Sequence, residues 1–92
     1  MDKRPKFLRI KSVIEKVAMA KSTFLEKVNK GLWPPQIHLG PGISVWIEDE
    51  LSEVMEAYAA GCNQEEIKTL ILKLVSERKS RASGDSNDEQ DS

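Results

Sequence analysis

Apolar residues recur at helical spacing in two short stretches of this sequence, residues 12–18 and 20–30. In each stretch, three apolar side chains fall on one side of a helix that turns by about 100° per residue. They are Val13, Ile14 and Val17 in the first stretch and Phe24, Leu25 and Val28 in the second. The pattern therefore predicts two short amphipathic helices, separated by a tight turn at residues 18–20.

Local signals mark the ends of these two helices. Ser12, followed three residues later by Glu15, is typical of a capping box at the start of the first helix. Gly31 suits the left-handed end of the second helix, and Pro34 and Pro35 prevent that helix from restarting.

After the prolines, the apolar residues follow a period of two. Apolar and polar residues alternate over residues 36–39, QIHL, and residues 43–47, ISVWI, are rich in β-branched and aromatic side chains. The stretch GPG at residues 40–42 separates the two runs. This pattern predicts a short two-stranded hairpin.

Helical spacing returns over residues 48–60 and 63–81. The apolar stripes are Leu51, Val54, Met55 and Tyr58 in the first and Ile67, Leu70, Ile71 and Leu74 in the second, with Val75 to one side. Three acidic residues, 48–50, suit the positive end of the first helix dipole, and Asn63 with Glu66 predicts a capping box for the second.

Together these elements predict a mainly α-helical fold with a small β-hairpin. Two short helices joined by a tight turn are the layout of a helix-turn-helix, and the hairpin that follows makes it a winged version. We therefore predict a winged helix-turn-helix DNA-binding domain over residues 1–60 and an additional amphipathic C-terminal helix over residues 61–81. Residues 82–92 are polar and acidic, which predicts a disordered tail.

The apolar stripe of the C-terminal helix has two interpretations. It either folds back on the winged domain, whose small core needs cover, or pairs with a second chain. Small DNA-binding modules are commonly dimers, because one recognition helix gives little specificity. We favour a homodimer through Ile67, Leu70, Ile71 and Leu74, and the fold-back alternative stays open.

Charge is divided unevenly between the two halves of the chain. Residues 1–46 carry nine basic and three acidic residues, a formal charge of +6, whereas residues 47–92 carry five and twelve, a formal charge of −7. Such asymmetry indicates an anion-binding half with an acidic counterpart, although exposed lysines also serve solubility. The basic half contains the predicted helix-turn-helix.

The strongest candidates for DNA contacts lie on the second helix. We expect Lys21, Ser22 and Thr23 at its start to donate to phosphates beside the helix dipole, and Lys27 or Lys30 to contact the flanking backbone. For the two hydroxyl residues, capping of the first turn is an equally good interpretation.

Three further residues complete the candidate site. Glu26 lies in the same polar arc, where it would either accept a hydrogen bond from a cytosine amine or repel phosphate. Gly40 and Gly42 would let the hairpin loop approach a DNA backbone or a minor groove closely.

The remaining reactive residues favour no catalytic or metal site. His38 is the single histidine and has no nucleophile or paired carboxylate at a telling spacing, so a surface position is the better interpretation. Cys62 is the single cysteine, which excludes an intrachain disulfide and a zinc cluster. The first residues lack a signal-peptide core, and no apolar run reaches bilayer length. We therefore predict a cytoplasmic protein that is not an enzyme, needs no cofactor and does not bind membranes.

The order of landmarks FLRI, AKSTF, GLWPP and LGPG, followed by Trp46 and an acidic helix start, resembles the AlpA family of small phage-associated regulators. These proteins are relatives of excisionases and of the DNA-binding half of MerR-type proteins. The resemblance covers residues 7–56 and implies a winged helix-turn-helix that binds duplex DNA.

Position by position, the resemblance implies that Leu8 and Arg9 form the leading Leu-Arg segment, which makes Arg9 a further candidate for a DNA contact, and that Lys21 stands at the motif arginine. It places Ser22 and Thr23 at the family's Ser-Thr pair. The chain departs from the family pattern at three other positions: Ala18 replaces the turn glycine, Ala20 the capping serine, and Gly42 the hairpin arginine.

The prediction that follows is a sequence-specific, duplex DNA-binding transcriptional regulator of AlpA type. We expect it to be linked to a prophage or another mobile element and to read the major groove with the helix at residues 20–30. Two alternatives stay open. One is a protein-binding adaptor acting through the helix at residues 63–81 and the acidic tail, and the other is an architectural, excisionase-like DNA-binding factor.

Overall fold

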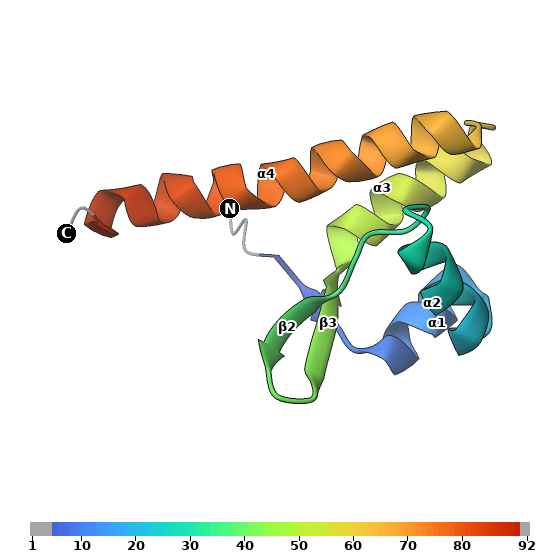
Figure 1. The fold of residues 1–92 in the computed structure, drawn as a ribbon, viewed down its shortest axis with the longest axis horizontal. Helices are drawn as coiled ribbons and strands as arrows, with labels where there is room; N and C mark the ends of the chain where they lie inside the picture. Colours follow the sequence, from blue (N-terminus) through green and yellow to red (C-terminus); the bar gives the residue numbers. More distant parts are fainter. Residues whose placement is uncertain (1–4, 91–92) are drawn as a thin grey trace.

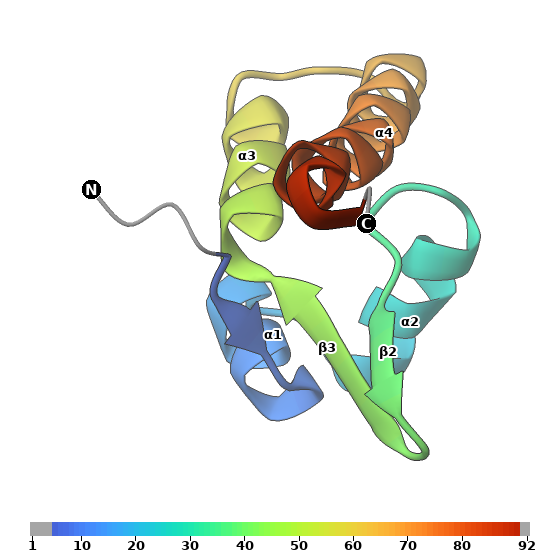
Figure 2. The ribbon, with the colours of Figure 1, turned by 90° about the vertical axis from the view of Figure 1, so that its left-hand side faces the viewer.

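The computed structural model describes the backbone of residues 5–90 and the side chains of residues 5–79 (Figure 1). In chain order the elements are β1 (Phe7–Leu8), α1 (Ile10–Val17), α2 (Lys21–Asn29), β2 (Ile37–Gly40), β3 (Ile43–Ile47), α3 (Glu48–Ala59) and α4 (Gln64–Gln90). The helices α3 and α4 pack together at one end of the molecule, and α1, α2 and the hairpin lie at the other (Figures 1 and 2). The predicted mainly helical fold with a small hairpin is confirmed.

The turn between α1 and α2 occupies residues 18–20, as predicted. Ala18 adopts a left-handed conformation with φ of 59°, and its N–H donates to the carbonyl oxygen of Ile14 at 2.9 Å. For a residue other than glycine this conformation costs roughly 1 kcal/mol. The alanine therefore keeps the turn geometry, at some cost in stability, at the position where the resembling family has glycine.

The predicted capping box of the first helix is wrong. The helix α1 begins at Ile10, its N-cap residue is Arg9, and no side chain caps its first turn. Ser12 and Glu15 therefore lie inside the helix rather than at its start. The reason is that Ile10 packs against the core, and burial of this side chain favours a helix that starts two residues before Ser12.

The sheet has three antiparallel strands in the order β1-β3-β2. The register pairs Leu8 with Trp46 across β1 and β3, and His38 with Ser44 across β2 and β3. The sequence predicted only the hairpin of β2 and β3, because a two-residue strand such as β1 is too short to show a hydrophobic period. Figure 2 shows β1 beside β3, where it ties the start of the chain to the hairpin.

Aromatic rings form the centre of the core. Phe24 of α2 is fully buried, and its ring lies 5.5 Å from that of Trp46 and 5.7 Å from that of Trp33, between centroids. Both tryptophans, Trp33 behind α2 and Trp46 on β3, are therefore buried in the core. Leu51 and Val54 of α3 complete this part of the core.

The structure contradicts the proposed dimer contact. The side chains of Ile67, Ile71 and Leu74 on α4 are buried in the core of their own chain, and Leu70 packs partly buried against it. These residues are therefore not available to pair with a second chain. The fold-back alternative is the one that the structure takes, because the small domain otherwise leaves its apolar face uncovered.

The helix α4 starts as predicted and ends later. The N–H of Asn63 donates to Oε1 of Glu66 at 2.8 Å, and the N–H of Glu66 donates to Oδ1 of Asn63 at 2.9 Å, which confirms the capping box. The prediction ended this helix at residue 81, but helical backbone continues to Gln90, since no proline interrupts it. The expected disorder of the acidic tail concerns residues whose side chains lie outside the described part of the chain.

Candidate nucleic-acid interface

The exposed side of α2 carries most of the predicted DNA contacts. Lys21, Ser22, Thr23, Glu26 and Lys30 are exposed. Phe24 anchors the opposite side of the helix in the core, with Leu25 and Val28 partly buried beside it. The amphipathic pattern of α2 therefore fixes which side chains point to solvent.

A hollow of about 250 Å³ lies between the start of α2 and the hairpin. Arg9 and Lys21 line it from the helical side, and Gln36, Gly42 and Ser44 line it from the hairpin side. Trp46 and Leu25 are among its apolar lining residues. The structure therefore brings together three of the predicted contact residues, Arg9, Lys21 and Gly42, from three separate segments.

Strand geometry explains why the hairpin presents polar side chains to this hollow. Ser44 and Trp46 lie two residues apart on β3, so they share one face of the sheet. Trp46 buries its ring against Phe24, and this leaves Ser44 facing the same hollow nearer the tip. Ser44 Oγ and His38 Nδ1 are 3.2 Å apart, at hydrogen-bonding distance.

The predicted surface position of His38 is confirmed, because its side chain is exposed.

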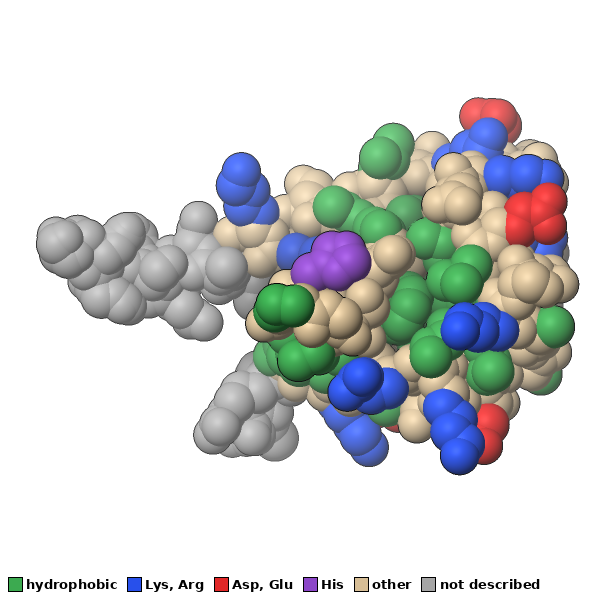
Figure 3. Space-filling view, turned by 60° about the horizontal axis from the view of Figure 1, so that its bottom comes forward, with side chains coloured by type: hydrophobic (Ala, Val, Ile, Leu, Met, Phe, Trp, Pro, Cys, Tyr) green, Lys and Arg blue, Asp and Glu red, His purple; other side chains and the backbone are tan. Residues whose placement is uncertain are grey.

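Figure 3 shows this end of the molecule with α1, α2 and the hairpin turned toward the viewer. Lys and Arg side chains surround an apolar area on this face, and acidic side chains are few. This face carries the basic character predicted for the first half of the chain, and two basic residues of that half, Arg9 and Lys21, line the hollow.

Lys27 lies elsewhere on α2 than the sequence predicted. It is half-buried and lines a second hollow of about 330 Å³, together with Met19, Trp33, Met55 and Tyr58. The prediction placed Lys27 in the same solvent arc as Ser22 and Lys30, whereas the structure puts it on the flank of α2 that faces α3. The two lysines of the first and second hollows, Lys21 and Lys27, thus lie on opposite flanks of the helix.

Glu26 is paired with Lys30 on the exposed side of α2. Their charged atoms, Oε2 and Nζ, are 3.4 Å apart, and the two side chains are 65% and 62% exposed. Such exposed pairs contribute little to stability. The pairing nevertheless places a carboxylate on the face that would meet phosphate.

The two glycines of the predicted hairpin contact differ in their roles. Gly42 has φ of +71°, which favours glycine, and a Cβ atom at this position would meet nothing within 4 Å. Gly40 pairs with Ile43 in the sheet and does not have a positive φ. Only Gly42 lines the hollow.

The sequence did not predict the hydrogen bond of the Tyr58 hydroxyl or the site positions of two polar residues, Gln36 and Ser44. Gln36 and Ser44 were not predicted as site residues, because only the register of β2 and β3 shows that they face α2. The hydroxyl of Tyr58 donates to the carbonyl oxygen of Leu32 at 2.9 Å, and burial raises the pKa of Tyr58 above its ordinary value of 10.0.

The described residues show no sign of a metal site or of a membrane-spanning helix. No group of three His, Cys, Asp or Glu residues there could hold a metal ion. Cys62 is half-buried. None of the helices that the structure describes has the length and apolar composition needed to cross a membrane.

The family model of the prophage CP4-57 regulatory protein (AlpA) matches residues 6–58, which span β1, α1, α2, the hairpin and most of α3. The chain therefore belongs to the AlpA family of phage regulatory proteins, and the resemblance seen in the sequence is confirmed. The whole of the C-terminal helix α4 lies beyond the matched residues.

A relative among the curated proteins is the uncharacterized protein ORF88 of Enterobacteria phage P4. It is 34% identical to this chain over 56 residues, which is 61% of this chain and 64% of that protein. The chain therefore matches somewhat less than two thirds of the length of this relative. No solved structure matches the chain significantly.

Proposed function

We propose that this protein is a sequence-specific, duplex DNA-binding transcriptional regulator of a prophage or another mobile element, and that α2 is its recognition helix. The observation that carries the proposal is the exposed N-terminal end of α2, with Lys21, Ser22 and Thr23, beside a hollow that Arg9 and the hairpin complete. Membership of a phage regulatory family supports the regulatory part of the proposal.

The start of α2 is suited to bind phosphate. Its N-cap residue is Ala20, and no side chain accepts a hydrogen bond from the N–H groups of the first turn. These N–H groups therefore remain free to donate hydrogen bonds to an anion, and the helix dipole adds partial positive charge at the same place. Lys21 and Arg9 add full charges beside it.

The exposed side of α2 is also suited to read bases. A major groove of B-DNA is about 12 Å wide and admits one helix. In that position the hydroxyls of Ser22 and Thr23 would face base edges, while the flanking cations contact phosphates. The hairpin would approach the backbone through Gly42, whose missing side chain leaves the loop open.

The adaptor alternative has less support from the structure. It acts through the C-terminal helix and the acidic tail, and the apolar side chains of Ile67, Ile71 and Leu74 on this helix are buried within the chain itself. The architectural, excisionase-like role uses the same DNA-binding face, so the same experiment addresses whether this face binds DNA.

Binding of a labelled duplex from the DNA that flanks the protein's own gene tests the proposal. The native chain is compared over a salt series with an Arg9→Ala/Lys21→Ala variant, which removes the two basic residues that line the hollow beside the hairpin, and with a Lys73→Ala/Lys79→Ala control, which removes two exposed charges from α4. We expect tight, salt-sensitive binding by the native chain and the control. The first variant should bind more weakly, with a slope of log K against log salt smaller by about 0.9 for each lost phosphate contact.

Two results would contradict the proposal. The first is the absence of duplex binding by the native chain at low salt. The second is an equal loss of affinity in both double variants, because total charge rather than the α2 face would then determine binding.

A further inference from the structure

Side chains from three different elements hold the linker between α2 and the hairpin. Residues 32–36 contain Pro34 and Pro35, which have no N–H groups and exclude a regular helix or sheet ladder here. The carbonyl oxygens of this linker therefore need donors from elsewhere. Each donor comes from a different element. The hydroxyl of Tyr58 on α3 donates to the carbonyl oxygen of Leu32 at 2.9 Å, and the indole nitrogen of Trp46 on β3 donates to that of Pro34 at 3.1 Å. The Nη2 of Arg78 on α4 donates to the carbonyl oxygen of Pro35 at 2.9 Å.

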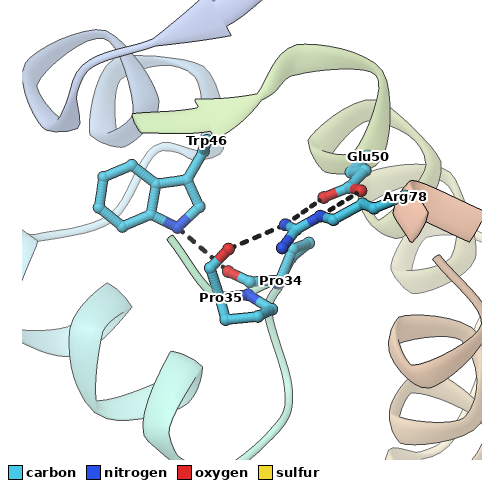
Figure 4. Close-up of polar contacts among 5 residues, drawn as sticks. All are labelled: Pro34, Pro35, Trp46, Glu50 and Arg78. Atoms are coloured by element: carbon cyan, nitrogen blue, oxygen red, sulfur yellow. Dashed lines mark hydrogen bonds and ion pairs between the residues drawn. The ribbon is translucent and has the colours of Figure 1, made fainter. Parts of the chain in front are cut away.

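Arg78 makes a second set of contacts with the same guanidinium group. Its Nε donates to Oε2 of Glu50 at 2.8 Å, and its Nη2 donates to Oε1 of Glu50 at 2.7 Å. Figure 4 shows the fork of Arg78 between the carboxylate of Glu50 and the carbonyl oxygen of Pro35. One side chain of α4 thus joins the start of α3 to the linker that leads into β2.

Glu50 is buried, with 5% of its surface exposed, and among the residues that the structure describes its carboxylate accepts hydrogen bonds from Arg78 alone. Glu50 lies in the first turn of α3 with the two preceding acids, as the sequence predicted, but the pair with Arg78 was not predicted. Its partner lies 28 residues away, so no local pattern could show the pair. A bidentate pair of this kind fixes orientation as well as distance.

We propose that Arg78 is a positioning residue that sets the placement of the hairpin relative to α2, and so controls how the hairpin side of the DNA-binding face meets DNA. The part of this inference that concerns DNA contacts rests on the proposed function. Pro35 precedes β2 by only two residues, so a displacement of Pro35 moves the strand that follows. Arg78 lies outside the residues that match the family model.

The hollow beside α2 is where such a displacement would act. Gln36, Gly42 and Ser44 form its hairpin wall, and Arg9 and Lys21 form the wall opposite. A shift of the hairpin changes the width of this hollow. It therefore changes which phosphates both walls can reach together.

A Glu50→Met/Arg78→Met double variant tests the proposal without leaving a buried, unpaired charge. Replacing a buried ion pair by apolar residues of similar volume usually preserves folding. The matched control is Lys73→Met, which exchanges one exposed basic residue of the same helix for the same apolar side chain. An Arg78→Lys variant keeps the charge but loses the fork, and its effects should lie between those of the native chain and the double variant.

The first readout needs no DNA. We expect amide hydrogen exchange in β2 and β3 to become roughly tenfold faster in the double variant, while exchange in α1 and α2 stays at the native rate. Native exchange in the hairpin of the double variant would overturn the proposal. Equal acceleration of every amide would also overturn it, because Arg78 would then stabilise the whole fold rather than position one part.

The second readout is duplex binding over a salt series. We expect the slope of log K against log salt to fall by about 1 in the double variant and to stay native in Lys73→Met, because the displaced hairpin loses a phosphate contact. A native slope and affinity in the double variant would overturn the claimed control of DNA contacts. If the native chain binds no duplex, the proposed function fails by itself, and the exchange measurement still decides whether Arg78 positions the hairpin.

Discussion

The indole nitrogen of Trp46 donates a hydrogen bond to the carbonyl oxygen of Pro34, 3.1 Å away. Trp33 packs against the same ring of Phe24, but its indole nitrogen is buried with no hydrogen-bond partner among the described residues. Both tryptophans therefore pack against Phe24, but the ring of Trp33 also lies 5.3 Å from that of Tyr58, between centroids, and only Trp46 makes the hydrogen bond to the linker. A comparison of the two residues tests how much this hydrogen bond contributes to stability.

Replacing each tryptophan by phenylalanine makes this comparison. Trp46→Phe leaves the carbonyl oxygen of Pro34 without its donor, so we expect it to lower the free energy of unfolding by about 1–2 kcal/mol more than Trp33→Phe does. Urea denaturation followed by circular dichroism measures both values. Equal losses would mean that the hydrogen bond to Pro34 contributes nothing measurable.

Alkaline pH should destabilise the fold through Tyr58. Burial raises the pKa of Tyr58 above 10.0 in the folded chain, so the unfolded chain ionises this residue first. The corresponding stability is present below the unfolded pKa and is lost as pH rises toward the folded pKa. Melting temperatures between about pH 9 and about pH 11 should therefore fall more steeply for the native chain than for Tyr58→Phe.

The comparison with Tyr58→Phe controls for lysines, which titrate in the same range in both proteins. The variant also loses the hydrogen bond to Leu32, so its melting temperature should be lower at neutral pH. Parallel curves for the two proteins would show that the ionisation of Tyr58 is not linked to folding.

Removing the carboxylate of Glu26 should strengthen DNA binding. Glu26 is exposed on α2 and pairs only weakly with Lys30, so Glu26→Gln frees that lysine and removes a charge that repels phosphate. We expect a gain in affinity of roughly threefold for any duplex, about the effect of one phosphate contact. Glu65→Gln, an exposed change of the same kind at the start of α4, is the control.

A different result for Glu26→Gln would assign a different role to this residue. Should the substitution lower affinity for one duplex and leave the others unchanged, Glu26 reads a base, as a carboxylate that accepts from cytosine would.

Replacing Gly42 by arginine should lower the stability of the fold and raise the affinity for duplex DNA. Gly42 has φ of +71° and open space around it, so Gly42→Arg has no steric conflict but carries a backbone cost of about 1 kcal/mol. The new cation on the hairpin wall of the hollow should increase duplex affinity. Gly42→Asn, which tolerates a left-handed conformation, is the control for the backbone change without added charge.

Duplex binding and thermal melting of both variants check this prediction. Unchanged affinity in Gly42→Arg, with a melting temperature close to that of Gly42→Asn, would show that the hairpin tip does not approach DNA. The proposed role of α2 would then stand without a contribution from the tip.

The predicted parts of the fold were those encoded within a few residues of one another. The turn at residues 18–20, the stop of α2 near Gly31, the hairpin and the capping box of Asn63 and Glu66 each depend on neighbours along the chain. The exposed positions on α2 followed from the period of its apolar residues, so Lys21, Ser22 and Thr23 could be named from the sequence. Lys27 was misplaced because its surroundings are supplied by α1 and α3.

The sequence by itself thus determined the order of helices and strands, the basic half of the chain and the exposed side of α2, since periodicity, capping and charge are local properties. Only the tertiary structure decided that α4 folds back on its own chain, that β1 joins the sheet and that Arg78 joins Glu50 to Pro35. These contacts bring together residues that are far apart in the chain. Their stability comes from burial and from the pairing of buried polar groups, which depend on the packed arrangement rather than on any local pattern.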